Sequence, residues 1–527
     1  MKKKWAGILA VCAAAALCGV SVQGADEKKE VIVTMPPTSE PTAGFDPAYG
    51  WGAGEHVHEP LIQSTLTTSN TDLSIGYDLA VSCDVSEDGL TWTVKIRDDV
   101  KFTDGEKLTA EDVAFTYNNC RDNSSVNDFS MLKEAVAVDE TTVEFHMEYP
   151  FSVWPYTMAT VGIVPEHAYD ENYGLNPVGS GRYIMKQWDQ GQQVILEANP
   201  DYYGEAPQME KVTILFMEED AALAAAQAGM VDVAHTSAIY SDVLPAGYEL
   251  FTAETVDNRG INLPAVEAFT NEDGVVVGSD VLSDVNVRRA INIGIDRETL
   301  IQNVLNGYGT PAYSVCDGMP WYNEISEVTY DAEEAAAILD EAGWVIGEDG
   351  IRQKDGVKAS FTLLYSMSEG IRQAIAEDVA NQLRNLGFEI TTEGVGWDTA
   401  YTRALSEPLV WGWGAHTPME LYNMYHSTEE TGLAMYSPYS SEAVDQYMDE
   451  ALRMTDLEES YELWKKAQWD GSQGITQDGD IPWVWICNVQ HLYFAREGLN
   501  IAEQKIHPHG HGWSLVNNID QWSWEES

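Results

Sequence analysis

Apolar and polar residues alternate strictly from position 92 to position 97, where the sequence reads WTVKIR. A period of two residues predicts a strand that is buried on one face. Turn signals that contain glycine flank this strand, EDG before it and DG after it. Thr109, followed three positions later by Asp112, predicts the start of a helix, because such a pair caps the first N–H groups and places an acid at the positive end of the helix dipole.

A different period appears later in the chain, where isoleucine, valine and leucine recur at every fourth position from 371 to 383. This spacing predicts one apolar face of a helix that ends near Gly387. Residues 221–229, AALAAAQAG, predict another helix that ends in glycine, and MVDV after it predicts a return to a strand. Because helix and strand signals alternate along the chain, the predicted fold class is α/β.

The segment 87–113, EDGLTWTVKIRDDVKFTDGEKLTAEDV, closely resembles the signature of the family 5 solute-binding proteins. Members of this family are the receptors of ABC importers for oligopeptides, dipeptides and nickel. Three further blocks resemble the family in the same order, at 176–203, 287–311 and 349–365. Four blocks in order are a far stronger signal than a single motif. One departure is Arg182, since family members usually carry proline at that position.

The resemblance implies a periplasmic-binding-protein-like α/β fold, with two lobes joined by a hinge and one extra domain peculiar to the family. We expect lobe I at residues 31–60, 174–262 and 481–527, domain II at 61–173, and lobe III at 263–480. Closure of the two lobes around one solute is the implied mechanism, in which the solute stabilises the closed state by its higher affinity for it. The implied partners are ABC permease and ATPase subunits.

Composition excludes several classes of protein. A chain of 527 residues needs more than one hydrophobic core. Its formal net charge of −56 repels nucleic acid, so no nucleic-acid partner is expected. No GxSxG, HExxH or GxxxxGK[ST] motif occurs, which favours a monomeric receptor that requires no cofactor over an enzyme. An exported hydrolase is the rival interpretation.

The first 24 residues are typical of a signal peptide, with three lysines before an apolar run from Trp5 to Val22. The protein is therefore expected to be exported and periplasmic or associated with the cell envelope. An uncleaved membrane anchor is an alternative, because the run reaches the lower limit for a span. A lipid anchor is disfavoured, since Leu17 precedes Cys18 where lipidation needs a small residue. The later cysteines form no CxxC motif, and both free thiols and disulfides remain open. They are Cys83, Cys120, Cys316 and Cys487.

Histidines are concentrated near the C-terminus, in the segment 506–513, IHPHGHGW. Proline and glycine between His507, His509 and His511 predict a loop and not a strand. Converging imidazoles suit nickel, zinc, copper or cobalt, so these three residues and His416 are a candidate metal site. His56 and His58 form a second HxH pair. The alternative is that the histidines are structural and hydrogen-bonded.

The segment 411–418, WGWGAHTP, is the second candidate region. Peptide-binding members of the family often place an aspartate here to pair with the α-amino group of the ligand. No acid lies in this segment, and His416 stands close to that position. Trp411, Trp413 and Tyr425 supply flat amphipathic walls for a solute. The missing acid and the histidines favour a metal chelate, whereas resemblance to most of the family favours a short peptide, and both remain open.

Three residues complete the candidate site. The resemblance places Tyr49 and Trp51, in DPAYGWG, at the mouth of the cleft, although packing against a neighbouring lobe explains them equally well. Arg121 is the candidate partner of an anionic ligand group, by resemblance to chelate-binding members, and Arg182 is a second candidate. A salt-bridged surface position is the alternative for both arginines.

Overall fold

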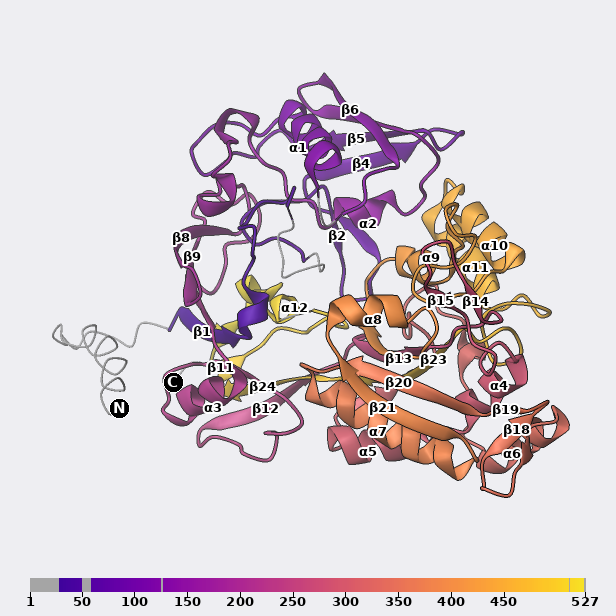
Figure 1. Ribbon diagram of the computed structural model, residues 1–527. Coiled ribbons are helices and arrows are strands. Elements are labelled where there is room, and N and C mark those ends of the chain that lie inside the picture. The colour runs from indigo at the N-terminus through magenta and orange to yellow at the C-terminus, as the bar shows by residue number, and fades with distance from the viewer. Residues whose placement is uncertain (1–27, 50–57, 125–126, 511, 526–527) are drawn as a thin grey trace.

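The computed structural model describes residues 28–49, 58–124, 127–510 and 512–525 (Figure 1). Domain II lies at the top of that view, lobe I at the lower left and lobe III at the right. Lobe I is built on a mixed seven-stranded sheet in which β1 is parallel to β10 and β11. In spatial order its strands are β12 (Tyr248–Ala253), β24 (His491–Arg496), β11 (Val233–Thr236), β1 (Glu30–Met35), β10 (Lys211–Phe216), β9 (Gln193–Ala198) and β8 (Tyr183–Asp189).

Domain II is a four-stranded antiparallel sheet covered by one helix. Its elements are β4 (Ala80–Val85), β5 (Thr91–Ile96), β7 (Thr142–Met147), β6 (Leu132–Asp139) and α1 (Ala110–Asn123). The predicted strand and capped helix are confirmed. Trp92, Val94 and Ile96 are buried on one face of β5. The Thr109 N–H donates to Asp112 Oδ2 over 2.9 Å at the start of α1.

Lobe III combines a four-stranded sheet, a parallel pair of strands and most of the helices. The sheet contains β16 (Gly309–Pro311), β23 (Trp483–Val489), β13 (Asn258–Asn262) and β22 (Val410–Trp413), in that order. The parallel pair is β20 (Ser360–Ser366) and β21 (Glu389–Val395). The helices are α4 (Val285–Ile293), α5 (Arg297–Leu305), α6 (Ala332–Glu341), α7 (Gly370–Asn385), α8 (Trp397–Arg403), α9 (Met419–Tyr425), α10 (Glu442–Leu452) and α11 (Leu457–Gln468).

The predicted helical stripe is confirmed in α7, where Ile375, Val379 and Leu383 are buried in the lobe III core. The alanine-rich helix is α3, which packs on β11. The remaining short elements are α2 (Trp154–Met158), α3 (Glu219–Gln227), α12 (Trp513–Val516), β2 (Thr67–Ser69), β3 (Ile75–Tyr77), β14 (Phe269–Thr270), β15 (Val276–Val277), β17 (Val345–Ile346), β18 (Arg352–Lys354), β19 (Val357–Lys358), β25 (Leu499–Asn500) and β26 (Ser523–Trp524).

Two strand connections cross between the lobes and form the hinge. One runs from β12 to β13 through residues 254–257, and the other runs from β23 to β24 through residue 490. They are hydrogen-bonded to each other, from Thr255 Oγ1 to the Val489 carbonyl and from the Val489 N–H to the Asp257 carbonyl, both over 2.8 Å. Strands β13 and β23, which the resemblance assigned to lobe I, pair within the lobe III sheet. The sequence could not show this pairing, because the partner of a strand is determined by contacts between residues that are far apart in the chain.

Domain II also touches lobe III directly. The Ser152 N–H donates to the Leu452 carbonyl over 2.9 Å, and the hydroxyls of Tyr156 and Tyr461 lie 2.6 Å apart. The ring of Trp321 lies edge-on to Tyr156, with centroids 5.6 Å apart. Domain II and lobe III are therefore in direct contact, in addition to the connections between lobes I and III.

Two further expectations concern cysteines and the membrane. Cys83, Cys120, Cys316 and Cys487 are free thiols, which confirms the first of the two alternatives. Within the described ranges, no helix has the length and apolar character needed to cross a bilayer.

Candidate functional site

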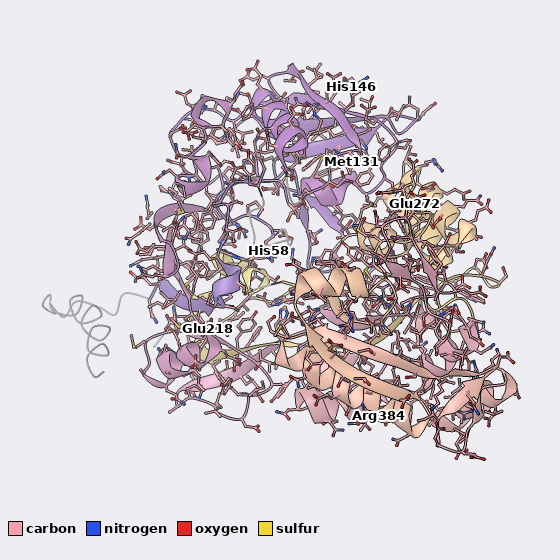
Figure 2. All side chains as sticks on the ribbon, in the orientation of Figure 1. His58, Met131, His146, Glu218, Glu272 and Arg384 are labelled. Carbon is pink, nitrogen blue, oxygen red and sulfur yellow. The ribbon has the colours of Figure 1, made fainter. Side chains whose placement is uncertain are left out.

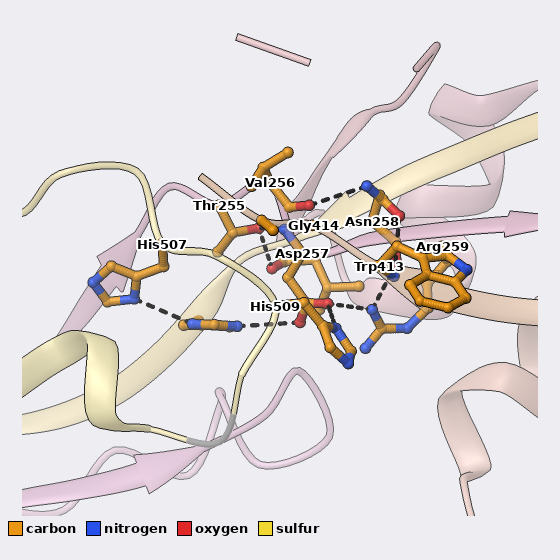
Figure 3. Close-up of polar contacts among 12 residues, drawn as sticks. Thr255, Val256, Asp257, Asn258, Arg259, Trp413, Gly414, His507 and His509 are labelled. Atoms are coloured by element: carbon orange, nitrogen blue, oxygen red, sulfur yellow. Dashed lines mark hydrogen bonds and ion pairs between the residues drawn. The ribbon is translucent and has the colours of Figure 1, made fainter. Parts of the chain in front are cut away.

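Asp257 lies at the hinge and gathers three basic side chains around its carboxylate (Figure 3). Arg259 Nη1 lies 2.5 Å from Oδ1, and His491 Nε2 lies 3.1 Å from Oδ2. His509 Nδ1 also contacts Oδ1. These residues come from β13, β24 and the C-terminal loop, so one carboxylate joins both lobes and the chain end. We call Asp257, Arg259, His491 and His509 the hinge cluster.

The environment of Asp257 keeps its carboxyl ionised. Burial by itself raises the pKa of a carboxyl group, but the Arg259 guanidinium outweighs this, followed by His509 and His491. The pKa of Asp257 is therefore held well below its usual value. A permanent negative charge at this position is what holds the basic groups of the hinge together.

The histidine loop continues the hinge as a third extended segment. The His507 N–H donates to the Glu254 carbonyl, and the Val256 N–H donates to the His507 carbonyl, each over 2.8 Å. Two residues on, the His509 N–H donates to the Gly414 carbonyl over 2.6 Å. Pro508 lacks an N–H, which ends regular pairing between these two contacts. The loop thus ties the hinge to the segment 411–418 in lobe III.

His58 lies on the other side of this loop, in the middle of the molecule (Figure 2). It is 5% exposed, and a Cβ at Gly510 would lie 2.9 Å from its Cε1 atom. A larger residue at position 510 would therefore require the His58 ring to shift. His56 and His511, which belong to the HxH motifs proposed from sequence, lie outside the described residues.

The segment 411–418 forms an aromatic wall beside the hinge cluster. The indoles of Trp411 and Trp413 stack with centroids 5.8 Å apart, and Tyr436 lies 4.6 Å from Trp413. Trp397 closes the other side at 5.7 Å from Trp411. Trp411 is buried, whereas Trp413 is partly exposed. Trp413, unlike Trp411, therefore has exposed surface that can meet a solute.

Two arginines converge where this wall meets the hinge cluster. A Cβ at Gly412 would lie 2.9 Å from Arg372 Nη2, 3.0 Å from Arg259 Nη1 and 3.2 Å from the His509 ring. Burial and the neighbouring Arg259 charge lower the pKa of Arg372 to about 10. Arg259 Nε is buried and finds no hydrogen-bond acceptor among the described residues. An anionic group next to these two guanidinium groups would reduce the repulsion between them.

Glu420 supplies the acid that the segment 411–418 lacks. From the first turn of α9, its carboxylate accepts the N–H groups of Gly414 over 2.9 Å and of Ala415 over 2.6 Å. Burial raises the pKa of Glu420 to about 7. With the Gly414 carbonyl bonded to His509, the backbone edge of this loop is already satisfied within the protein.

The histidines proposed as metal ligands have protein partners. His416 Nε2 donates to the Ile506 carbonyl over 2.8 Å, and burial lowers the pKa of His416 to about 3. His507 is fully buried, with both ring nitrogens in contact with side chains. Nowhere in the part of the chain that the structure describes do three or more His, Cys, Asp or Glu side chains surround a space for a metal ion. The donor set of His416, His507 and His509 does not fit a bound metal, and we assign none of the three as a metal ligand.

The remaining predicted site residues are dispersed. Tyr425 is buried, and its hydroxyl accepts from Trp485 Nε1 over 3.0 Å, so it packs behind the wall. Arg121 pairs with Asp122 over 2.8 Å at the outer end of α1, which is the surface salt bridge of the alternative interpretation. Arg182 pairs with Asp520 over 2.6 Å. Tyr49 is 43% exposed, and Trp51 lies outside the described residues.

Sequence reasoning missed the four residues that organise the site: Asp257, Arg259, Arg372 and His491. Asp257 and Arg259 lie in the run VDNRG, which carries no recognisable motif. Arg372 had a weak signal, since it follows Ile371 on the helix with the apolar stripe, and a charged side chain at the border of such a stripe is often buried with a partner. Glu420 lies two residues beyond the segment that we searched for an acid.

Comparison with known proteins identifies the family. The pattern described as bacterial extracellular solute-binding proteins, family 5, middle region, matches residues 74–433. The chain belongs to this family, as the sequence blocks predicted, and the predicted fold class is confirmed.

Known relatives match most of the chain. Protein XP55 of Streptomyces lividans is 30% identical, over 93% of this chain and 90% of its own length. The oligopeptide-binding protein AppA of Bacillus subtilis, solved in complex with a nonapeptide, superposes with a TM-score of 0.69 at 25% identity, over 95% of this chain and all of AppA. NikZ of Campylobacter jejuni, solved with Ni(L-His), gives a TM-score of 0.74 at 21% identity, over 94% and 99% of the two chains, and this likeness concerns the fold. Family members are extracytoplasmic binding proteins.

Proposed function

We propose that the protein is the exported receptor of an ABC importer, which captures one small anionic solute at the hinge and delivers it to a permease and its ATPase subunits. Membership of the family supports the receptor role. The observation that carries the solute class is the pair of buried guanidinium groups of Arg259 and Arg372 beside the Trp411–Trp413 wall. Planar guanidinium groups recognise carboxylates by paired hydrogen bonds, and the indoles supply apolar contact to the rest of the solute.

A short peptide or peptide-like solute is the first candidate. Its terminal carboxylate would pair with the two arginines, and a side chain would lie against Trp413. The nonapeptide bound by AppA, a relative at 25% identity, supports this class.

A metal chelate carried as cargo is the second candidate, and one observation favours it. The N–H groups of Gly414 and Ala415 are occupied by Glu420, and the Gly414 carbonyl is occupied by His509. An extended peptide that adds to a sheet edge needs free backbone groups. A compact chelate with several carboxylates needs only the arginines and the aromatic wall.

The test is mass spectrometry under native conditions of protein purified without chelators or affinity tags, followed by calorimetric titration of the solute found. We expect one retained solute with at least one carboxylate, and at least tenfold weaker binding by the Arg372→Ala variant. Arg121→Ala is the matched control, because Arg121 pairs with Asp122 on the surface of domain II. A solute without a carboxylate, or equal losses in both variants, would contradict the proposal. Turnover of the solute by the purified protein would favour the hydrolase.

A further inference from the structure

A chain of amide groups with known orientation ends at the histidines of the hinge. The indole of Trp522 can only donate, and its Nε1 lies 3.0 Å from Asn518 Oδ1, so that atom is an acceptor. Gln504 Nε2 lies 2.8 Å from the same oxygen and must therefore be its donor. The other end of this amide, Gln504 Oε1, faces His507 Nε2 over 3.1 Å. Because Oε1 only accepts, His507 carries a proton on Nε2.

Counting hydrogen-bond donors and acceptors in the same way shows that His491 is also protonated. Its Nε2 lies 3.1 Å from Oδ2 of the ionised Asp257, which only accepts, so His491 also carries a proton on Nε2. Between the rings, His491 Nδ1 and His507 Nδ1 are 3.1 Å apart, and a hydrogen bond there needs one further proton (Figure 3). The two imidazoles therefore share three protons. One ring of the pair is an imidazolium.

The surroundings decide which ring is charged. His507 is fully buried, and burial, followed by repulsion from His491, holds its pKa well below the usual value. His491 is 14% exposed by its side chain and lies against the Asp257 carboxylate. An ion pair in that position is stabilised, whereas a charge on His507 has no carboxylate partner.

We propose that His491 is held as an imidazolium across the hinge and that its charge makes it a specificity-determining residue for an anionic solute. With His491 charged, His491 and Arg259 share the carboxylate of Asp257, while Arg372 is paired with Glu369. Loss of the His491 proton would remove one positive charge from this group of side chains. An added positive charge among buried side chains attracts an anion and repels a cation.

Further ionisable groups lie near His491 or its partner Asp257, among them the buried carboxyl of Glu420, whose pKa is raised to about 7 by burial. Lys505 is already paired with Glu59, and Glu254, beside Gln490, is exposed to solvent. His491 also lines a cavity of about 180 Å³ between the lobes, where burial keeps His235 neutral by lowering its pKa to about 4. The ionisable groups that contact His491, or that are linked to it through one hydrogen-bonded neighbour, are Asp257, Arg259, His507 and His509. Glu254, Lys505 and His235 lie farther from it.

The protonation state can be read without any solute. Nitrogen-15 NMR of the full-length protein at pH 7.5, with the His491 signals assigned from a His491→Gln variant, reports whether each ring nitrogen carries a proton. A free histidine is only about one-tenth protonated at that pH. We expect both nitrogens of His491 to carry protons and His507 to carry one, on Nε2. A single proton on His491 would overturn the proposal.

The specificity arm rests on the proposed function and uses Fe(III)-EDTA, an anionic chelate, as the probe in calorimetric titration. We expect His491→Gln to weaken its binding roughly tenfold and His491→Lys, which keeps the charge, to bind nearly as the wild type. His146→Gln is the matched control, since His146 lies at the outer end of domain II (Figure 2). Equal binding by wild type and His491→Gln would overturn the specificity role. A wild type that binds no Fe(III)-EDTA would count against the chelate candidate, while the NMR result still decides the proton.

Discussion

Asp257 and His491 join the two strands that cross between the lobes, through a contact of 3.1 Å between Oδ2 and Nε2. The pair stands where any closing motion must pivot. The same carboxylate bonds to Arg259, which reaches the candidate solute site, so the hinge and the site share one charged group. A change in the charge at Asp257 is therefore expected to affect both stability and solute binding.

Asp257→Asn should lower the free energy of unfolding by about 3–5 kcal/mol at pH 7, because it leaves the buried Arg259 without its partner. The folded-state pKa of Asp257 is depressed, so its contribution is present above the unfolded value of about 3.9 and is lost as pH falls below it. Urea unfolding at pH 7 and at a pH well below the unfolded value of about 3.9 measures both effects, and the difference from wild type should be smaller at the lower pH. Asp122→Asn is the control, because its salt bridge with Arg121 is exposed. Similar losses of unfolding free energy in the two variants would show that the buried contacts of Asp257 contribute no more than an exposed salt bridge.

Trp413→Ala and Trp411→Ala should have different effects. Trp413 is partly exposed on the wall, so its loss should weaken solute binding by roughly 1–3 kcal/mol and leave the fold intact. Trp411 is 3% exposed, so its loss should lower the free energy of unfolding by about 3–5 kcal/mol. Calorimetric titration with the co-purified solute and urea unfolding separate the two. The reverse assignment would place the solute on the other side of the wall.

Glu420→Gln should stabilise the protein more at pH 8 than at pH 5. Burial raises the pKa of Glu420 to about 7. The free energy of unfolding of the wild type therefore falls as pH rises from about 4 towards 7, because the folded state disfavours the ionised carboxylate. Glutamine keeps an acceptor oxygen for Gly414 or Ala415 without that charge. Thermal unfolding at the two pH values measures the difference, with Glu430→Gln on the surface as control. A gain of equal size at both pH values would argue against a raised pKa.

Tyr461→Ala should loosen the contact between domain II and lobe III, because it removes the hydroxyl contact of 2.6 Å with Tyr156 and the neighbouring packing on Trp321. Small-angle scattering should show a monomer with a larger radius of gyration than the wild type, and addition of the co-purified solute should reduce it. Tyr330→Ala, at a position that is 47% exposed, is the control. Unchanged scattering with and without solute in every variant would contradict hinge closure.

Local elements could be predicted because their signals lie close together in the chain. The alternation from 92 to 96 and the Thr109–Asp112 pair produced β5 and α1, and the four-residue period produced the buried face of α7. The His-rich loop was correctly expected to be irregular, and the structure shows that it contacts the segment 411–418 at Gly414. The role of its histidines could not be predicted, because whether an imidazole binds a metal or a carbonyl depends on which atoms lie within about 3 Å of it.

By itself the sequence determined the family, the α/β class and the receptor role, and it predicted the neighbourhood of a candidate site, since these are carried by residue order and by local periodicity. Only the tertiary structure decided the chemistry of that neighbourhood. Asp257, Arg372 and His491 come from three separate stretches of the chain, and the charge on each depends on the others. Electrostatic interactions act through space and strengthen with burial, so a pattern along the chain cannot show which carboxylate meets which arginine or where a proton resides.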